Sequence, residues 1–150
     1  MRQFYDLCPE TAIRETRTII TFKQSLLPDD EYGFVDFYCD EPDCDCRRST
    51  IQVRAKNQGL VATLSYGWES LEFYEKWYRA PSEEITGVTL APTMPQSKYA
   101  DKLLELFKET LLNDPEYASR FPRHYRQFKA AITAKSRATK PRSRRRTISR

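Results

Sequence analysis

The chain has 150 residues, of which 39% are hydrophobic and 13% aromatic, and this is enough to bury the core of one domain. No run is long and apolar enough to predict a transmembrane helix, and Met1–Cys8 lacks the apolar region of a secretory signal, so we expect a cytoplasmic protein. The net charge of +4 conceals two opposite parts: residues 135–150 carry eight basic side chains and no acidic one, whereas residues 1–134 are slightly acidic.

The first half of the chain predicts an antiparallel sheet of four to five strands. Alternating and β-branched residues predict these strands, which we place at 16–23, 32–39, 50–55, 60–66 and 85–90. Asn57-Gln58-Gly59 is a turn signal that joins two of them as neighbours.

Helical spacing dominates the second half. A short helix is predicted over 68–78 with Ser70 as its N-cap, and two longer ones over 97–112 and from Pro115 onward, the last interrupted at Pro122. The fold class expected is therefore α+β, with a C-terminal helical hairpin that follows the sheet. We place a single domain at 1–134 and a disordered basic tail at 135–150.

Three of the four cysteines lie close together between two predicted strands. Cys39, Cys44 and Cys46 form the pattern C-x4-C-x-C, and Pro42 favours a turn that would bring their thiolates together. Clustered cysteines in a chain without a secretory signal usually bind metal or act in catalysis, so we predict a zinc site at the tip of a hairpin. Free thiols and disulfides are the alternatives.

Cys8 is the expected fourth ligand of this zinc site. His124, the one histidine, is its competitor, and water or another chain are further options. An all-cysteine site would be structural, because four thiolates leave no open position for a substrate. The acidic residues between the cysteines lack the pattern of a calcium loop, so we interpret them as a solvated turn.

The basic residues near the C-terminus predict contact with nucleic acid. The tail has too few apolar side chains to order by burial, and its charge would attract phosphates with little dependence on sequence. A solubilising terminus or contact with acidic proteins are the alternatives. The candidate nucleic-acid-binding residues are Arg120, Arg123, Arg126, Lys129, Lys135, Arg137, Lys140, Arg142, Arg144, Arg145, Arg146 and Arg150.

The run Tyr38-Cys39-x-x-Pro42-x-Cys44-Asp45-Cys46 resembles a YC-x-x-P-x-C-D-C element of uncharacterised bacterial proteins, several of which are suspected metal binders. This local resemblance implies metal binding and a bacterial origin, and it carries no established activity.

An enzyme is the least favoured class. The chain has one histidine and four glycines, and it lacks the motifs of nucleophile elbows, P-loops and dinucleotide sites. We therefore expect a non-enzymatic zinc-binding protein whose basic tail associates with nucleic acid. A protein-interaction or assembly module with a structural metal site is the main alternative, followed by a metal- or cysteine-dependent enzyme.

Overall fold

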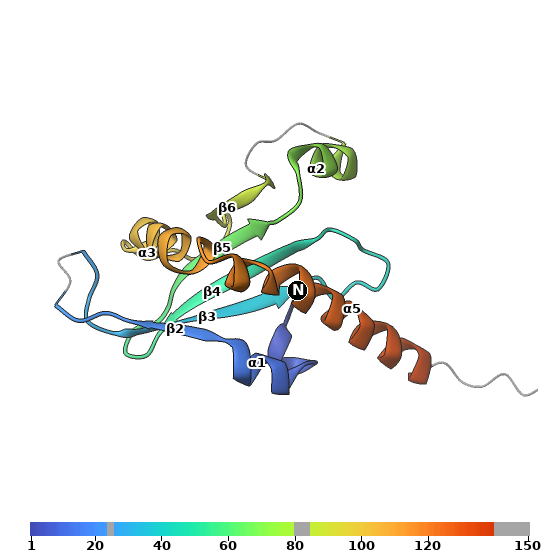
Figure 1. Ribbon diagram of the computed structural model, residues 1–150, viewed down its shortest axis with the longest axis horizontal. Helices are drawn as coiled ribbons and strands as arrows, with labels where there is room; N and C mark the ends of the chain where they lie inside the picture. The colour runs from blue at the N-terminus through green and yellow to red at the C-terminus, as the bar shows by residue number, and fades with distance from the viewer. Residues whose placement is uncertain (24–25, 80–84, 140–150) are drawn as a thin grey trace, which may run out of the picture.

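The computed structural model describes residues 1–23, 26–79 and 85–139, which form an α+β structure around one antiparallel sheet (Figure 1). Within these ranges the sheet has six strands: β1 (Arg2–Gln3), β2 (Arg17–Ile20), β3 (Glu31–Tyr38), β4 (Arg48–Ala55), β5 (Gly59–Gly67) and β6 (Gly87–Leu90). Their order is β1-β3-β4-β5-β6, and β2 also pairs with β3. The predicted fold class is confirmed, and the short β1 is an addition to the five predicted strands.

The helical elements of the second half follow the predicted order, and two short helical elements near the N-terminus are additions to the prediction. They are η1 (Phe4–Asp6), α1 (Pro9–Glu15), α2 (Leu71–Tyr78), α3 (Ala100–Leu106), the π-helical turn η3 (Phe107–Leu112), α4 (Pro115–Ala118) and α5 (Arg120–Thr139). Ser70 caps α2 as predicted, because its side chain accepts a hydrogen bond from the Phe73 N–H. No helix in the described part of the chain is both long and apolar enough to cross a bilayer.

The sequence predicts that Pro122 splits the helix from Pro115 into two, and the structure divides it at Ser119 into α4 and α5, although α5 continues through Pro122 itself. Pro122 is the third residue of α5, where the backbone nitrogen has no intrahelical acceptor to lose, so proline is tolerated there. The helix then extends to Thr139, beyond the predicted domain end at residue 134. The remainder of the predicted tail, residues 140–150, lies outside the described residues.

The main core lies between the sheet and the helices that cross it in Figure 1. Burial alternates along β3 and β4, so that Phe34 and Ile51 face the same side of the sheet. Both side chains join the cluster formed by Leu103 of α3 and Phe107 of η3. The residues on the opposite face of these strands are only partly buried, which is typical of an antiparallel sheet covered on one face.

A second core cluster joins the two ends of the chain. Phe4 and Cys8 from the N-terminal segment are buried with Tyr38, the last residue of β3, and with Tyr125 and Phe128 of α5. The centroid of the Tyr38 ring lies 5.9 Å from that of the Phe4 ring and 5.7 Å from that of the Phe128 ring. This cluster fixes α5 beside the point where β3 ends and the cysteine-bearing loop begins.

A buried polar network holds α1, β3 and α5 together near the second cluster. His124 of α5 places Nδ1 2.9 Å from Asp36 of β3 and Nε2 2.8 Å from Glu15 of α1, and its ring stacks on Phe4. Glu15 also accepts a hydrogen bond of 2.6 Å from Arg123. Carboxylates are acceptors, and a neutral imidazole has one N–H, so this arrangement requires a second proton shared within the network.

We expect the free energy of unfolding to fall at acid pH, because Glu15 of this network becomes protonated. The hydrogen bond from Arg123, followed by that from His124, lowers the pKa of Glu15 to about 2, below its value in an unfolded chain. The resulting stability, up to roughly 3 kcal/mol, is present above about pH 4.5 and is lost as pH falls towards 2. Urea unfolding of the wild type and Glu15→Gln should therefore differ most at pH 6, differ less at pH 3 and converge near pH 2.

Glu10→Gln is the matched control, because Glu10 lies exposed at the start of the same helix. We expect it to unfold like the wild type at every pH. A Glu15→Gln deficit that stays constant from pH 6 to pH 3 would contradict the role of the ionised Glu15 carboxylate.

Candidate metal centre

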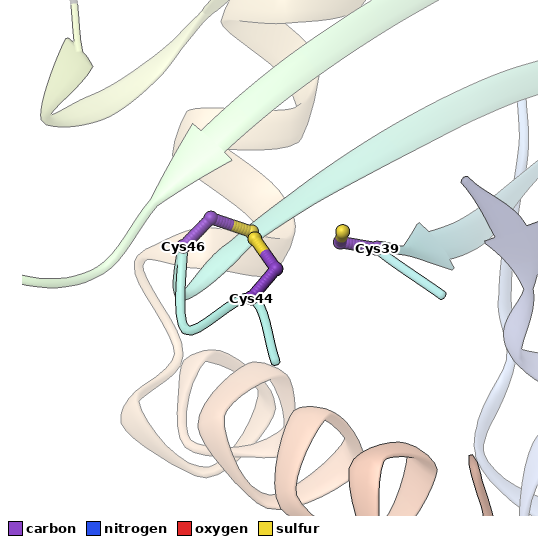
Figure 2. Close-up of side chains that lie close together, drawn as sticks. All are labelled: Cys39, Cys44 and Cys46. Atoms are coloured by element: carbon purple, nitrogen blue, oxygen red, sulfur yellow. The ribbon is translucent and has the colours of Figure 1, made fainter. Parts of the chain in front are cut away.

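The cysteine cluster lies in the loop of residues 39–47, which joins β3 to β4. The Sγ atoms of Cys39, Cys44 and Cys46 all lie within 4.8 Å of one another, and Figure 2 shows those of Cys44 and Cys46 pointing towards each other. Three thiolates bound at about 2.3 Å to one tetrahedral ion are about 3.8 Å apart, so only a small closure would form a metal site. The predicted cluster at a hairpin tip is confirmed for these three cysteines.

Side chains of α5 hold one side of this loop by binding backbone carbonyls of the loop. Tyr125 Oη lies 3.3 Å from the carbonyl oxygen of Cys44, and Lys129 Nζ donates to the carbonyl oxygen of Glu41 over 2.7 Å. The Cys44 N–H donates to the same Glu41 carbonyl and closes the turn around Pro42. The positions of Cys39 and Cys44 are thus set by contacts outside the loop as well as by the turn itself.

Helix α2 holds the other side. Tyr74 Oη donates to the carbonyl oxygen of Arg47 over 2.6 Å, and Arg47 adopts a positive φ of 47°, a conformation uncommon for a residue with a side chain. Gly67 permits this approach, because a Cβ at that position would lie 2.8 Å from Tyr74 Oη and 2.5 Å from the carbonyl oxygen of Ile85. The contact therefore requires glycine at the end of β5.

The loop's acidic side chains are partly neutralised by partners other than a metal ion. Asp45 pairs with Arg47 at 2.9 Å, and Asp40 pairs with the N-terminal ammonium group at 2.9 Å. These contacts lower the pKa of both carboxyl groups. The thiols are therefore the groups that converge in the loop, whereas the carboxylates of Asp40 and Asp45 are directed to other cations.

Burial raises the pKa of the Cys46 thiol to about 12, and the neighbouring Cys44 adds to this effect. Burial likewise raises the pKa of Cys39. Adjacent thiolates repel one another when no cation is present, and a bound metal ion reverses this balance because it deprotonates its thiol ligands. The cluster is thus chemically suited to a cation that can displace the thiol protons.

Cys8 and His124, the two residues predicted as candidates for the fourth ligand, are held by other parts of the fold. Cys8 is 6% exposed within the second core cluster, and it is not among the cysteines that converge in the loop. Both ring nitrogens of His124 are hydrogen-bonded to the carboxylates of Glu15 and Asp36. Within the described residues the loop therefore brings together three cysteines that could hold a metal ion.

The predicted basic stripe on α5 divides into internal and external residues. Arg120 is 8% exposed and donates to the carbonyl oxygen of Glu15, whereas Arg123 pairs with the Glu15 carboxylate and Lys129 binds the loop. The exposed basic residues of the described part of α5 that form no salt bridge there are Arg126, Lys135 and Arg137. The remaining candidates, which lie outside the described residues, are Lys140, Arg142, Arg144, Arg145, Arg146 and Arg150.

The loop-holding roles of Tyr74, Tyr125 and Lys129 were not expected from the sequence. Tyr74 and Tyr125 fit the helical spacing of packed aromatic residues, and Lys129 fits a solvated basic face. Their partners are 27, 81 and 88 positions away along the chain, so no local pattern could have indicated these contacts.

The chain matches no family model, no curated protein and no solved structure. Its class is therefore defined by its own geometry, as an α+β protein in which three clustered cysteines could hold a metal ion.

Removal of a bound metal should destabilise the fold. We expect about one zinc ion per chain, and chelation should lower Tm by at least about 5 °C because the free energy of ligation contributes to folding. Cys44→Ser should lose the metal and melt like the chelated protein. Metal analysis of the purified protein together with thermal unfolding would test both expectations.

Cys8→Ala provides the control for cysteine removal as such. Because Cys8 lies in an apolar cluster, we expect this variant to keep its metal and to lose only about 1 kcal/mol of packing. Loss of zinc from Cys8→Ala would instead place this residue in the ligand set. Wild-type protein that melts at one temperature with and without chelator would contradict the metal site.

Proposed function

We propose that the protein binds zinc through its cysteine loop and associates with nucleic acid through its basic C-terminal part, without catalytic turnover. The observation that carries the proposal is the convergence of Cys39, Cys44 and Cys46 within 4.8 Å in a loop held from two helices. Thiolates favour zinc, copper(I) and iron–sulfur clusters, and zinc suits a single tetrahedral site without redox change.

The metal would act as a structural crosslink of the loop. Its fourth position would be occupied by water or by a ligand that moves to the loop, and Cys8 would have to leave the second core cluster to supply it. Because the loop contacts α2, α5 and the N-terminal ammonium group, fixing its shape would stabilise the contacts of all three.

The nucleic-acid part of the proposal rests on charge. Arg126, Lys135 and Arg137 lie exposed on α5, and the chain continues beyond Thr139 with six further basic residues and no acidic one. Such a segment binds phosphates by releasing counterions, so its affinity should vary little with base sequence and fall steeply with salt.

Shortening the chain at Thr139 should remove most of this affinity. We expect full-length protein that makes about four phosphate contacts to bind roughly a hundredfold more weakly at 200 mM than at 50 mM salt. The shortened chain should bind weakly at both concentrations and keep its Tm. Fluorescence anisotropy with labelled single- and double-stranded DNA and RNA would measure these differences.

A length-preserving pair of variants controls for the missing residues. Replacement of Arg144, Arg145 and Arg146 by glutamine should weaken binding, whereas replacement of Thr147, Ile148 and Ser149 by alanine should not. Equal, weak binding by the full-length and shortened chains would remove the nucleic-acid role.

Apolar side chains at the β2 edge favour protein interaction as a second candidate function. Ile20 of β2 and Phe22 just after it are each 71% exposed, and in the described residues β2 pairs only with β3. An edge strand with exposed apolar residues can pair with a strand of another chain.

If this edge associates with a second copy, sedimentation velocity should show a dimer that forms with increasing concentration, and Ile20→Lys should weaken it. Ile13→Lys is the matched control, because Ile13 is similarly exposed, at 72%, on α1 instead of the strand. A monomer at every concentration would argue against self-association through β2.

A further inference from the structure

A cleft of about 300 Å³ lies between the cysteine loop, the segment after β5 and the first turns of α5. Asp45 and Arg47 line it from the loop, Trp68 and Glu69 from the segment after β5, and Tyr125 and Arg126 from α5. Its volume is at the lower end of the range of small-molecule sites. The cleft is thus large enough for one planar ring with its substituents.

The aromatic wall of the cleft is fixed in place. The ring centroids of Trp68 and Tyr125 lie 5.5 Å apart, and the ring planes meet at 64°. Tyr125 is further held by its contacts with Cys44 and Asp45 in the loop. Trp68 also packs against Tyr66, and it remains only partly buried. A flat ligand could therefore stack here without ordering the wall first.

The charges of the cleft leave one cation without an acidic partner. Arg47 pairs with both Asp45 and Glu69, so its charge is already balanced. Arg126 is exposed and forms no salt bridge in the described part of the chain. Beside the aromatic wall there is consequently a free guanidinium, which is suited to a phosphate group.

We propose that this cleft binds one nucleotide of a single-stranded nucleic acid, with the base against Trp68 and a neighbouring phosphate at Arg126. The inference rests on the proposed nucleic-acid function and adds the class of nucleic acid. A paired base stays stacked within its duplex, whereas an unpaired base can enter a cleft and stack on an aromatic side chain. The carboxylates of Asp45 and Glu69 can accept hydrogen bonds from N–H groups on the base edge, such as the N3–H of thymine.

Helix geometry gives the bound strand a direction. Arg137 follows Arg126 by 11 residues, which is about three turns, so both side chains project from the same side of α5 roughly 16 Å apart. A strand whose base occupies the cleft could then run along α5 towards the basic residues beyond Thr139. Lys135 lies nine residues after Arg126, about half a turn away, on the opposite side of the helix.

The cleft is also coupled to the metal site. Asp45 and Arg47, which line the cleft, alternate in sequence with Cys44 and Cys46, so the cleft and the cysteine cluster share one short stretch of backbone. Metal binding that fixes the loop should therefore tighten the cleft, and chelation should weaken its preference for a base-bearing strand.

The test compares two probes of equal length and charge: an eight-nucleotide oligothymidylate and an abasic oligodeoxynucleotide. The chain has two tryptophans, so Trp77→Phe makes Trp68 the sole reporter. At constant salt we expect the full-length, zinc-loaded protein to bind oligothymidylate about tenfold more tightly than the abasic strand, with quenching of Trp68 fluorescence. Arg126→Ala should remove most of this preference, and the charge-matched Lys135→Ala should keep it.

The outcomes separate this inference from the function on which it rests. Equal affinity for both probes without quenching of Trp68 overturns the cleft and leaves phosphate-driven binding intact. A preference that is lost equally in Lys135→Ala and Arg126→Ala also overturns it, because the effect would then be one of charge alone. Absence of any binding at 50 mM salt overturns both proposals.

Discussion

The hydrogen bonds that Tyr125 and Lys129 donate to the backbone of the cysteine loop connect the candidate metal site with the rest of the molecule. Both come from α5, whose own position is fixed by burial of Phe128 against Tyr38 and by the ion pair of Arg123 with Glu15. Because Tyr38 directly precedes Cys39, the same helix packs on the last residue of β3 and holds the loop that follows. The spatial arrangement of the three sulfur atoms thus depends on packing between residues that lie far from the cysteines in the sequence.

The polar network around His124 shows why a lone histidine near a cysteine cluster need not be a ligand. A metal-bound imidazole needs one ring nitrogen with a free lone pair, whereas both nitrogens of His124 are occupied by carboxylates. Asp36 also accepts a hydrogen bond from the hydroxyl of Tyr38, which belongs to the second core cluster, so the polar network and this cluster are in direct contact. The electrostatics of the network stabilise the attachment of α1 and α5 and leave the loop to supply the thiols.

The sequence could predict those parts of the structure that depend on local pattern. Alternation identified β3, β4 and β5, the Ser70 cap identified the start of α2, and the spacing around Pro42 identified the convergence of the cysteines. Contacts between distant residues could not be read in this way. The separation of Cys8 from the loop follows from tertiary packing, and the helical conformation of Pro122 follows from its place in the first turn.

The loop of residues 39–47 carries two kinds of chemistry at alternate positions of its second half, and this arrangement links the two proposals. The cysteines offer soft anionic ligands to a cation, while the alternate positions Asp45 and Arg47 use their charges on each other and form the wall of the cleft. The cysteines and the cleft are joined by the loop backbone, whose carbonyls are bound by Tyr125, Lys129 and Tyr74. Tyr125 also lines the cleft, so its hydrogen bond to Cys44 is a direct contact through which metal occupancy would influence the binding of a nucleotide.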